Sequence, residues 1–188
     1  MKKDLRASLR SILARLTPEE IRERSAAAAN LLFAQPEFKR AEILMLFLSL
    51  PNEIDTTPIA LRSWQERKRV LAPKVSWEQR RMLPIEIRSL SDGVTSSPLG
   101  IREPADGVPI PVADIDLVIV PGLGFDPFGN RLGRGRGFFD RFLAHKDFRG
   151  VSCALAFEEQ LVPQVPAGPH DIPVDMLVTD KHVRRFGR

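Results

Sequence analysis

The sequence predicts an α/β fold with three layers, α-β-α, in which helices cover an open, Rossmann-like, mostly parallel sheet. Short β-branched or apolar runs alternate with helical patterns, which is typical of parallel sheets. The 188 residues, 43% of them hydrophobic, suffice for one core. A glycine-rich segment also joins a strand-like run to a helix-like run. We therefore expect a single α/β domain over residues 1–188, with its ligand site at the carboxyl ends of the strands.

Two helices are expected at the amino terminus. The first is predicted by apolar residues that recur at helical spacing, namely Leu5, Leu9, Ile12, Leu13 and Leu16. The second begins with a capping residue, a first-turn proline and a capping-box glutamate, at Thr17, Pro18 and Glu20, and runs towards Pro36. We expect this helical pair, residues 2–35, to pack on the sheet.

Strands and helices then alternate along the chain. Six apolar runs predict strands, at residues 42–48, 69–72, 81–87, 116–120, 151–156 and 176–179. A helix is expected at 58–68, and the order strand, helix, strand favours parallel pairing. Residues 89–111 have no clear period, so they form an ordered loop or a weak hairpin.

The glycine–arginine block, residues 121–140, contains six glycines, three arginines and two aspartates. It follows the strand at 116–120 and leads into a helical pattern that includes Phe138 and Phe142. Glycines at alternate positions let the backbone approach a ligand, while Arg134 and Arg136 offer paired donors beside it. At a strand end and a helix start, this pattern favours phosphate binding.

Other interpretations of the block remain open. Its spacing meets neither nucleotide-binding fingerprint, and glycine–arginine alternation also occurs in flexible RNA-binding tails or in simple turns with solvated arginines. A single short copy between ordered elements favours phosphate over RNA. Asp126 and Asp140 add carboxylates that could take the magnesium that accompanies nucleotides.

Charge and composition narrow the class of ligand. The chain has 28 basic and 24 acidic residues, for a net charge of +4, and residues 129–150 alone carry six basic and two acidic side chains. This local excess favours a small anion over a nucleic acid. We find no signal-peptide pattern and no run of membrane-spanning length, so a cytoplasmic enzyme without a membrane partner is expected.

The remaining candidate residues are isolated. Cys153 lies in an apolar run and is expected to be a buried, inert thiol. The three histidines, His145, His170 and His182, lack metal-ligand spacing and are interpreted as structural or solvent-facing. Glu53 follows the first strand and either bonds a polar heterocycle or is a surface acid. Asp171 and Asp175 precede the final expected strand.

Four segments resemble, in order, the 5-formyltetrahydrofolate cyclo-ligase family, also called methenyltetrahydrofolate synthetase. They are residues 47–55, 121–140, 155–160 and 170–175, so the resemblance spans nearly the whole chain. The most specific part is Asn-Arg-Leu-Gly-Arg-Gly from position 130, followed by a basic residue, glycine, two aromatics and Asp140. This order of residues is a hallmark of the family.

The resemblance implies a reaction that converts 5-formyltetrahydrofolate to 5,10-methenyltetrahydrofolate and consumes ATP with Mg²⁺. In the family, the formyl oxygen is phosphorylated, the ring closes, and ADP and phosphate are released. The implied partners are these small molecules alone, and the implied protein is a monomer. A non-catalytic folate- or nucleotide-binding protein, or a basic RNA-binding module, is the alternative.

The resemblance also implies roles for individual residues. Nucleotide contacts would come from the first helix and the block, at Lys2, Lys3, Asp4, Leu5, Arg6, Arg131, Leu132, Gly133, Arg134, Gly135, Arg136, Gly137, Phe138 and Phe139. Folate contacts would be Leu48, Glu53, Arg134, Gly135, Arg136, Gly137 and Phe138. Arg134 and Arg136 would act catalytically on the migrating phosphoryl group. Asp140 and Asp175 resemble the magnesium-associated acids.

The chain departs from the family pattern at two places. Many members carry tyrosine at the positions of Phe138 and Phe139, whereas this chain contains no tyrosine. These two rings can therefore offer only stacking or packing. Arg136 is lysine in some relatives, an exchange that keeps the charge but alters the geometry.

Overall fold

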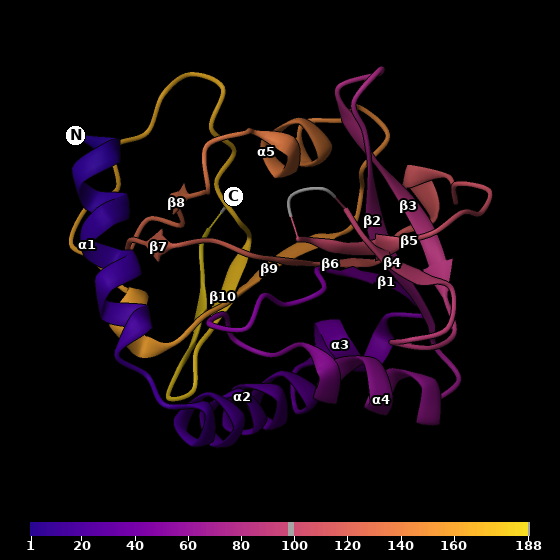
Figure 1. Ribbon diagram of the computed structural model, residues 1–188, viewed down its shortest axis with the longest axis horizontal. Helices are drawn as coiled ribbons and strands as arrows, with labels where there is room; N and C mark the ends of the chain where they lie inside the picture. Colours follow the sequence, from indigo (N-terminus) through magenta and orange to yellow (C-terminus); the bar gives the residue numbers. More distant parts are fainter. Residues whose placement is uncertain (98–99, 188) are drawn as a thin grey trace.

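The computed structural model describes residues 1–97 and 100–187, and within them a seven-stranded mixed sheet forms the centre of the molecule (Figure 1). The strand order is β11-β10-β9-β6-β1-β2-β3. The pairs from β10 to β2 are parallel, while β3 and β11 join the two edges in antiparallel fashion. The expected open, mostly parallel sheet is confirmed.

The strands of this sheet are short, as in many doubly wound folds. They are β1 (Ile43–Leu46), β2 (Arg69–Ser76), β3 (Arg81–Ile87), β6 (Leu117–Val120), β9 (Val151–Leu155), β10 (Met176–Val178) and β11 (Val183–Arg185). β2 is longer than expected because it continues into a hairpin with β3, in which Ser76 faces Arg81. β11 was not expected, since two of its three residues are arginines, whose side chains suit an exposed edge.

Helices cover both faces of the sheet. They are α1 (Lys2–Ala14), α2 (Pro18–Phe33), α3 (Pro36–Arg40), α4 (Thr57–Gln65) and α5 (Phe138–Leu143), with 3₁₀ turns η1 (Val112–Asp114) and η2 (Glu158–Gln160). α2, α3 and α4 lie along one face and α5 lies over the other (Figure 1). Alternate strand residues serve the two cores: Leu44 and Leu46 point to one, Met45 to the other.

The amino-terminal helices separate in space. The capping box predicted at Thr17 and Glu20 is confirmed and begins α2, which packs on the sheet. α1 stands instead beside a small hairpin of β7 (Gly124–Phe125) and β8 (Arg131–Leu132), at the end of the sheet (Figure 1). Gly124 permits this approach, since a Cβ there would lie 2.6 Å from Cδ1 of Leu9. The hairpin inside the glycine–arginine block was not expected.

A second small hairpin occupies the segment at 89–111. β4 (Val94–Ser96) pairs with β5 (Arg102–Pro104), so of the two forms expected for this segment the weak hairpin is the one present. Positions 98–99 of this segment lie outside the described residues. β5 contacts β2, which brings the hairpin to the side of the sheet where β1 and β2 end.

The order of the strands reverses between β1 and β6. The chain leaves β1 towards β2 on one side, whereas it leaves β6 towards β9 on the other. Loops after two such strands diverge and open a crevice at their carboxyl ends. The loop with Glu53 follows β1 and the glycine–arginine block follows β6, so this crevice is where they meet.

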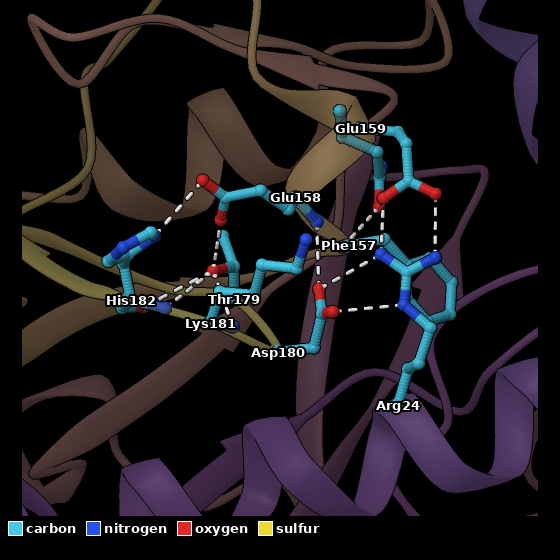
Figure 2. Close-up of polar contacts among 9 residues, drawn as sticks. Arg24, Phe157, Glu158, Glu159, Thr179, Asp180, Lys181 and His182 are labelled. Atoms are coloured by element: carbon cyan, nitrogen blue, oxygen red, sulfur yellow. Dashed lines mark hydrogen bonds and ion pairs between the residues drawn. The ribbon is translucent and has the colours of Figure 1, made fainter.

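An ion-pair network fastens α2 to the ends of β9 and β10 (Figure 2). Arg24 of α2 donates from Nε to Oδ2 of Asp180 at 2.9 Å and pairs with Glu159. Asp180, only 5% exposed, also accepts the Glu158 amide at 2.9 Å. The hydrogen bond from Arg24 holds the pKa of Glu159 below its ordinary value. The network ties three segments that are distant in sequence.

Replacing Arg24 with alanine should lower the free energy of unfolding by about 1–3 kcal/mol, because the buried Asp180 carboxylate loses its cation. Urea unfolding of the two proteins measures this difference. The matched control is Arg88→Ala, whose side chain is 88% exposed and which should change stability by less than about 0.5 kcal/mol. Equal stability of Arg24→Ala and wild type would show that the network contributes nothing.

Candidate active site

A cavity of about 480 Å³ opens at the carboxyl ends of β1 and β6 and extends over β2 and β3. Cavities of this size hold small organic ligands. Its lining has a cationic half from α1 and the glycine–arginine block, formed by Lys2, Arg6, Arg131, Arg134 and Arg136, and Arg102 of β5 is a sixth cation of the lining. It also has an apolar half, formed by Phe47, Leu48, Pro73, Val75, Met82 and Ile101. The cavity can therefore receive a ligand with both an anionic and an apolar part.

The first helix contributes two cations to the cavity. Lys2 and Arg6, four residues apart, lie on the same face of α1. Arg6 donates from Nε to the carbonyl of Gly133 at 2.9 Å, and Nζ of Lys2 lies 2.7 Å from Oδ2 of Asp171. The other expected contacts of this segment face elsewhere: Lys3 and Asp4 are exposed, and Leu5 packs against the core.

Three glycines of the block adopt backbone angles that side chains rarely accept, and the first of them, Gly129, has a φ of 85°. φ is 112° at Gly135 and 71° at Gly137, which is the residue before α5. Gly133 is constrained differently, because a Cβ there would lie 2.9 Å from Nη1 of Arg131. Every expected block residue from Gly133 to Phe139 lines the cavity, whereas Leu132 is buried in the core.

Arg131 anchors the block from inside. Its Nη1 donates to the Pro121 carbonyl at 3.1 Å, its Nη2 lies 3.4 Å from Oδ1 of Asp140, and its guanidinium carbon lies 5.9 Å from the Phe139 ring centre. Burial lowers the pKa of this arginine. Its Nε is the one buried side-chain polar atom of the described residues that has no hydrogen-bond partner. Arg131 thus joins the end of β6 to α5.

Glu53 connects the two halves of the cavity. It is buried, with 7% exposed, and its Oε1 accepts the Leu50 amide at 3.0 Å. Its Oε2 lies 3.3 Å from Nη2 of Arg134. Burial raises the pKa of Glu53, and the charge of Arg134 opposes this rise. Glu53 is therefore not the surface acid that was one of its two expected roles, and its contact with a polar heterocycle stays a prediction.

The buried position of Glu53 predicts a pH dependence of stability. Its pKa lies above the ordinary value of 4.5, so the native state binds the proton more tightly than the unfolded state. The stability from the protonated acid is therefore fully present below 4.5 and lost as pH rises through the folded pKa. Urea unfolding of wild type and Glu53→Gln over a pH series should show wild type losing stability relative to the variant as pH rises. A constant difference would contradict this.

The two expected magnesium-associated acids are not brought together. Asp140 lines the cavity and accepts the Ile172 amide on Oδ1 at 2.9 Å. Asp175 lies before β10, where its Oδ2 accepts the Ser152 amide at 2.9 Å. Asp171, to which no role was assigned, lines the cavity instead. Spacing alone did not distinguish the two, because both precede the same strand.

The described residues hold no cluster of three or more His, Cys, Asp or Glu side chains that could bind a metal on their own. Cys153 is fully buried, and burial raises the pKa of its thiol, so the prediction of a buried thiol is confirmed. In the part of the chain that the structure describes, no helix is long and apolar enough to cross a bilayer.

Comparison with known proteins identifies the family. A sequence model described as the 5-formyltetrahydrofolate cyclo-ligase family matches residues 1–180. The chain belongs to this family. A mouse 5-formyltetrahydrofolate cyclo-ligase is 31% identical over 185 residues, covering 93% of this chain and 91% of the relative. The cyclo-ligase of Escherichia coli K12 is 33% identical over 172 residues, covering 89% and 94%.

A solved structure agrees with this family. The 5,10-methenyltetrahydrofolate synthetase of Aquifex aeolicus superposes with a TM-score of 0.85 at 33% identity, covering 100% of this chain and 94% of that one. The family resemblance, which rested on four sequence segments, is therefore confirmed over almost the whole of this chain. The family reaction is the ATP-dependent cyclisation of 5-formyltetrahydrofolate to 5,10-methenyltetrahydrofolate, which makes this protein a ligase of folate one-carbon metabolism.

Proposed function

We propose that this cavity binds ATP and 5-formyltetrahydrofolate together and carries out the cyclisation, with release of ADP and phosphate. The observation that carries the proposal is the Glu53–Arg134 contact, which joins an apolar half of the cavity to a cationic half. A flat heterocycle suits the apolar half and a phosphate chain suits the cationic half. The two reacting groups would then meet where Glu53 and Arg134 touch.

The cationic half holds the phosphates. Arg134 and Arg136 are the catalytic candidates that neutralise the migrating phosphoryl group, because phosphoryl transfer depends on positioning and on charge stabilisation. Lys2 and Arg6 add charge from α1. The bond from Arg6 to Gly133 also fixes the block against that helix.

The apolar half holds the folate. Leu48 and Phe138 both line the cavity and supply apolar contacts, and Phe138 offers stacking without the hydroxyl of a tyrosine. The Glu53 carboxylate, already held by the Leu50 amide, accepts hydrogen bonds from the donor edge of the pterin ring. Burial of this acid strengthens such bonds, since the local dielectric constant is low.

The chemistry follows from the formyl group. Its amide-like oxygen is a poor leaving group, so the oxygen first attacks the terminal phosphorus of ATP, and the bond from that phosphorus to ADP breaks. The second folate nitrogen then attacks the activated carbon and loses its proton to solvent. The bond from carbon to the phosphorylated oxygen breaks, and phosphate departs with the former formyl oxygen. Arg134 and Arg136 balance the negative charge in both steps.

Magnesium is proposed on the basis of Asp140. Mg²⁺ at phosphate sites takes one or two carboxylates besides phosphate oxygens and water, so an all-protein cage is not required. Asp140 lines the cavity, and within the described contacts only its Oδ1 is engaged. Bound there, Mg²⁺ would neutralise phosphate charge. Asp175 stays a prediction, as do the cytoplasmic location and the monomeric state.

A turnover assay tests the proposed reaction. The protein, ATP, Mg²⁺ and 5-formyltetrahydrofolate should give the methenyl product, seen by its near-ultraviolet absorbance, with one ADP for each product. Folate binding without product would mean a non-catalytic binding protein. Tight RNA binding with steep salt dependence and no ATP consumption would mean a basic RNA-binding module. Either result would overturn the enzyme assignment.

A further inference from the structure

The tip of the β2–β3 hairpin, residues 77–80, contacts the glycine–arginine block from outside the cavity. Trp77 at this tip is 53% exposed, an unusual position for so large an apolar side chain. Its ring centre lies 5.4 Å from the guanidinium carbon of Arg136 and 5.5 Å from the Phe138 ring, which it meets edge to face. Arg136 and Phe138 both line the cavity, whereas Trp77 lies behind them.

Arg141 reinforces this contact between the hairpin tip and the block. Its Nε donates to the Arg80 carbonyl at 2.9 Å and its Nη2 to the Arg136 carbonyl at 3.0 Å. Its guanidinium carbon also lies 4.9 Å from the Phe138 ring centre. The hairpin tip therefore lies beside α5 (Figure 1). The backbone of Arg136 is held by Arg141, and its side chain lies against the Trp77 ring.

The charges around Arg136 explain why an aromatic ring is a suitable partner for its guanidinium. Five other cations line the same cavity, namely Lys2, Arg6, Arg102, Arg131 and Arg134. In residues 1–97 and 100–187, no carboxylate forms an ion pair with Arg136. The electron-rich face of an indole attracts a guanidinium without forming a competing salt bridge. Such a contact uses the face of the guanidinium and leaves its N–H groups at the edge to donate to a phosphate.

We propose that Trp77 is a positioning residue for Arg136: it holds the guanidinium at the rim of the cavity, in the place from which its N–H groups donate to the phosphates of the bound nucleotide. This inference rests on the proposed function of the cavity and names a further residue for it. Trp77 itself does not line the cavity. It lowers the entropy that Arg136 would otherwise lose on binding.

Trp77 fluorescence reports whether Arg136 binds the nucleotide. The chain has two tryptophans, so Trp64→Phe leaves Trp77 as the sole indole. Adding a non-hydrolysable ATP analogue with Mg²⁺ should change its emission saturably, because the phosphates alter the charge of the guanidinium environment against the ring. The same change should be missing in Trp64→Phe with Arg136→Ala, where no guanidinium rests there. An identical response with and without Arg136 would overturn the proposal.

Kinetics give the second test. Trp77→Ala should raise KM for ATP by about 2- to 5-fold, the size expected of one exposed cation–π contact, with kcat and KM for the folate nearly unchanged. Trp77→Phe should restore most of the affinity. In the Arg136→Ala background, Trp77→Ala should add nothing. Additive effects, or a change in KM for the folate instead, would mean a merely structural role.

The proposed reaction and the positioning role of Trp77 can be overturned independently of each other. Binding of the analogue is measured without turnover, so coupling between Trp77 and Arg136 can be present even if no methenyl product forms. That result would overturn the reaction and keep the positioning role. Product formation with uncoupled Trp77 and Arg136 would overturn the positioning role and keep the reaction.

Discussion

Arg134→Ala is expected to lower kcat about 100- to 1,000-fold, because removing one preorganised donor from a developing charge costs this much in other enzymes. The variant should stay folded, with its free energy of unfolding lowered by about 1–2 kcal/mol, because the buried Glu53 acid loses its ion pair with Arg134. Arg134→Lys keeps the positive charge but loses the paired donors of the guanidinium, so its kcat should lie between those of wild type and Arg134→Ala. Wild-type kinetics in Arg134→Ala would refute its catalytic role.

A matched control separates this role from an indirect effect on Glu53. Without Arg134, the buried Glu53 carboxylate has lost its cation, which by itself could disturb the folate half. Affinity for the non-hydrolysable ATP analogue should therefore be measured in Glu53→Gln with and without Arg134→Ala. Arg134→Ala should weaken nucleotide binding in the wild-type background and equally in the Glu53→Gln background. If Arg134→Ala leaves nucleotide affinity unchanged in the Glu53→Gln background, the defect is caused by the unpaired Glu53 carboxylate and not by the loss of Arg134 itself.

Arg131→Met is expected to lower the free energy of unfolding by about 3 kcal/mol, because it leaves the Asp140 carboxylate and the Pro121 carbonyl without a buried partner. Turnover should also fall, since Arg131 joins the block to α5. Urea unfolding and steady-state kinetics measure the two effects.

The double variant with Asp140→Asn tests the cause of this instability. Asparagine still accepts the Ile172 amide but carries no charge, so part of the lost stability should return while activity stays low. An Arg131→Met protein as stable as wild type would show that the buried pair contributes nothing. Full recovery of activity in the double variant would contradict the roles of both residues.

Local patterns predicted most of the fold because each was determined by nearby residues. The capping box at Thr17 and Glu20 began a helix, and the apolar run at 116–120 became β6. The elements that were not expected depend on distant partners. β11 is polar and exists through pairing with β10, and the β7–β8 hairpin forms where α1 packs against the block.

The candidate site shows the same division. The block residues from Gly133 to Phe139 were expected to bind ligand. They line the cavity because they are consecutive in the chain and follow the carboxyl end of β6. Asp171 was missed because its position depends on the long-range contact with Lys2. Trp77 was missed because only tertiary structure brings a hairpin tip to Arg136. Sequence spacing carries no information on either contact.

The fate of the formyl oxygen shows whether it attacks the terminal phosphorus of ATP when the two substrates are bound together in the cavity. 5-Formyltetrahydrofolate labelled with a heavy oxygen isotope in its formyl group is converted with unlabelled ATP, and the released phosphate is analysed by mass spectrometry. Direct attack of that oxygen on the terminal phosphorus predicts one heavy oxygen in each phosphate. Unlabelled phosphate, with the heavy isotope recovered in water or retained by the folate, would contradict it.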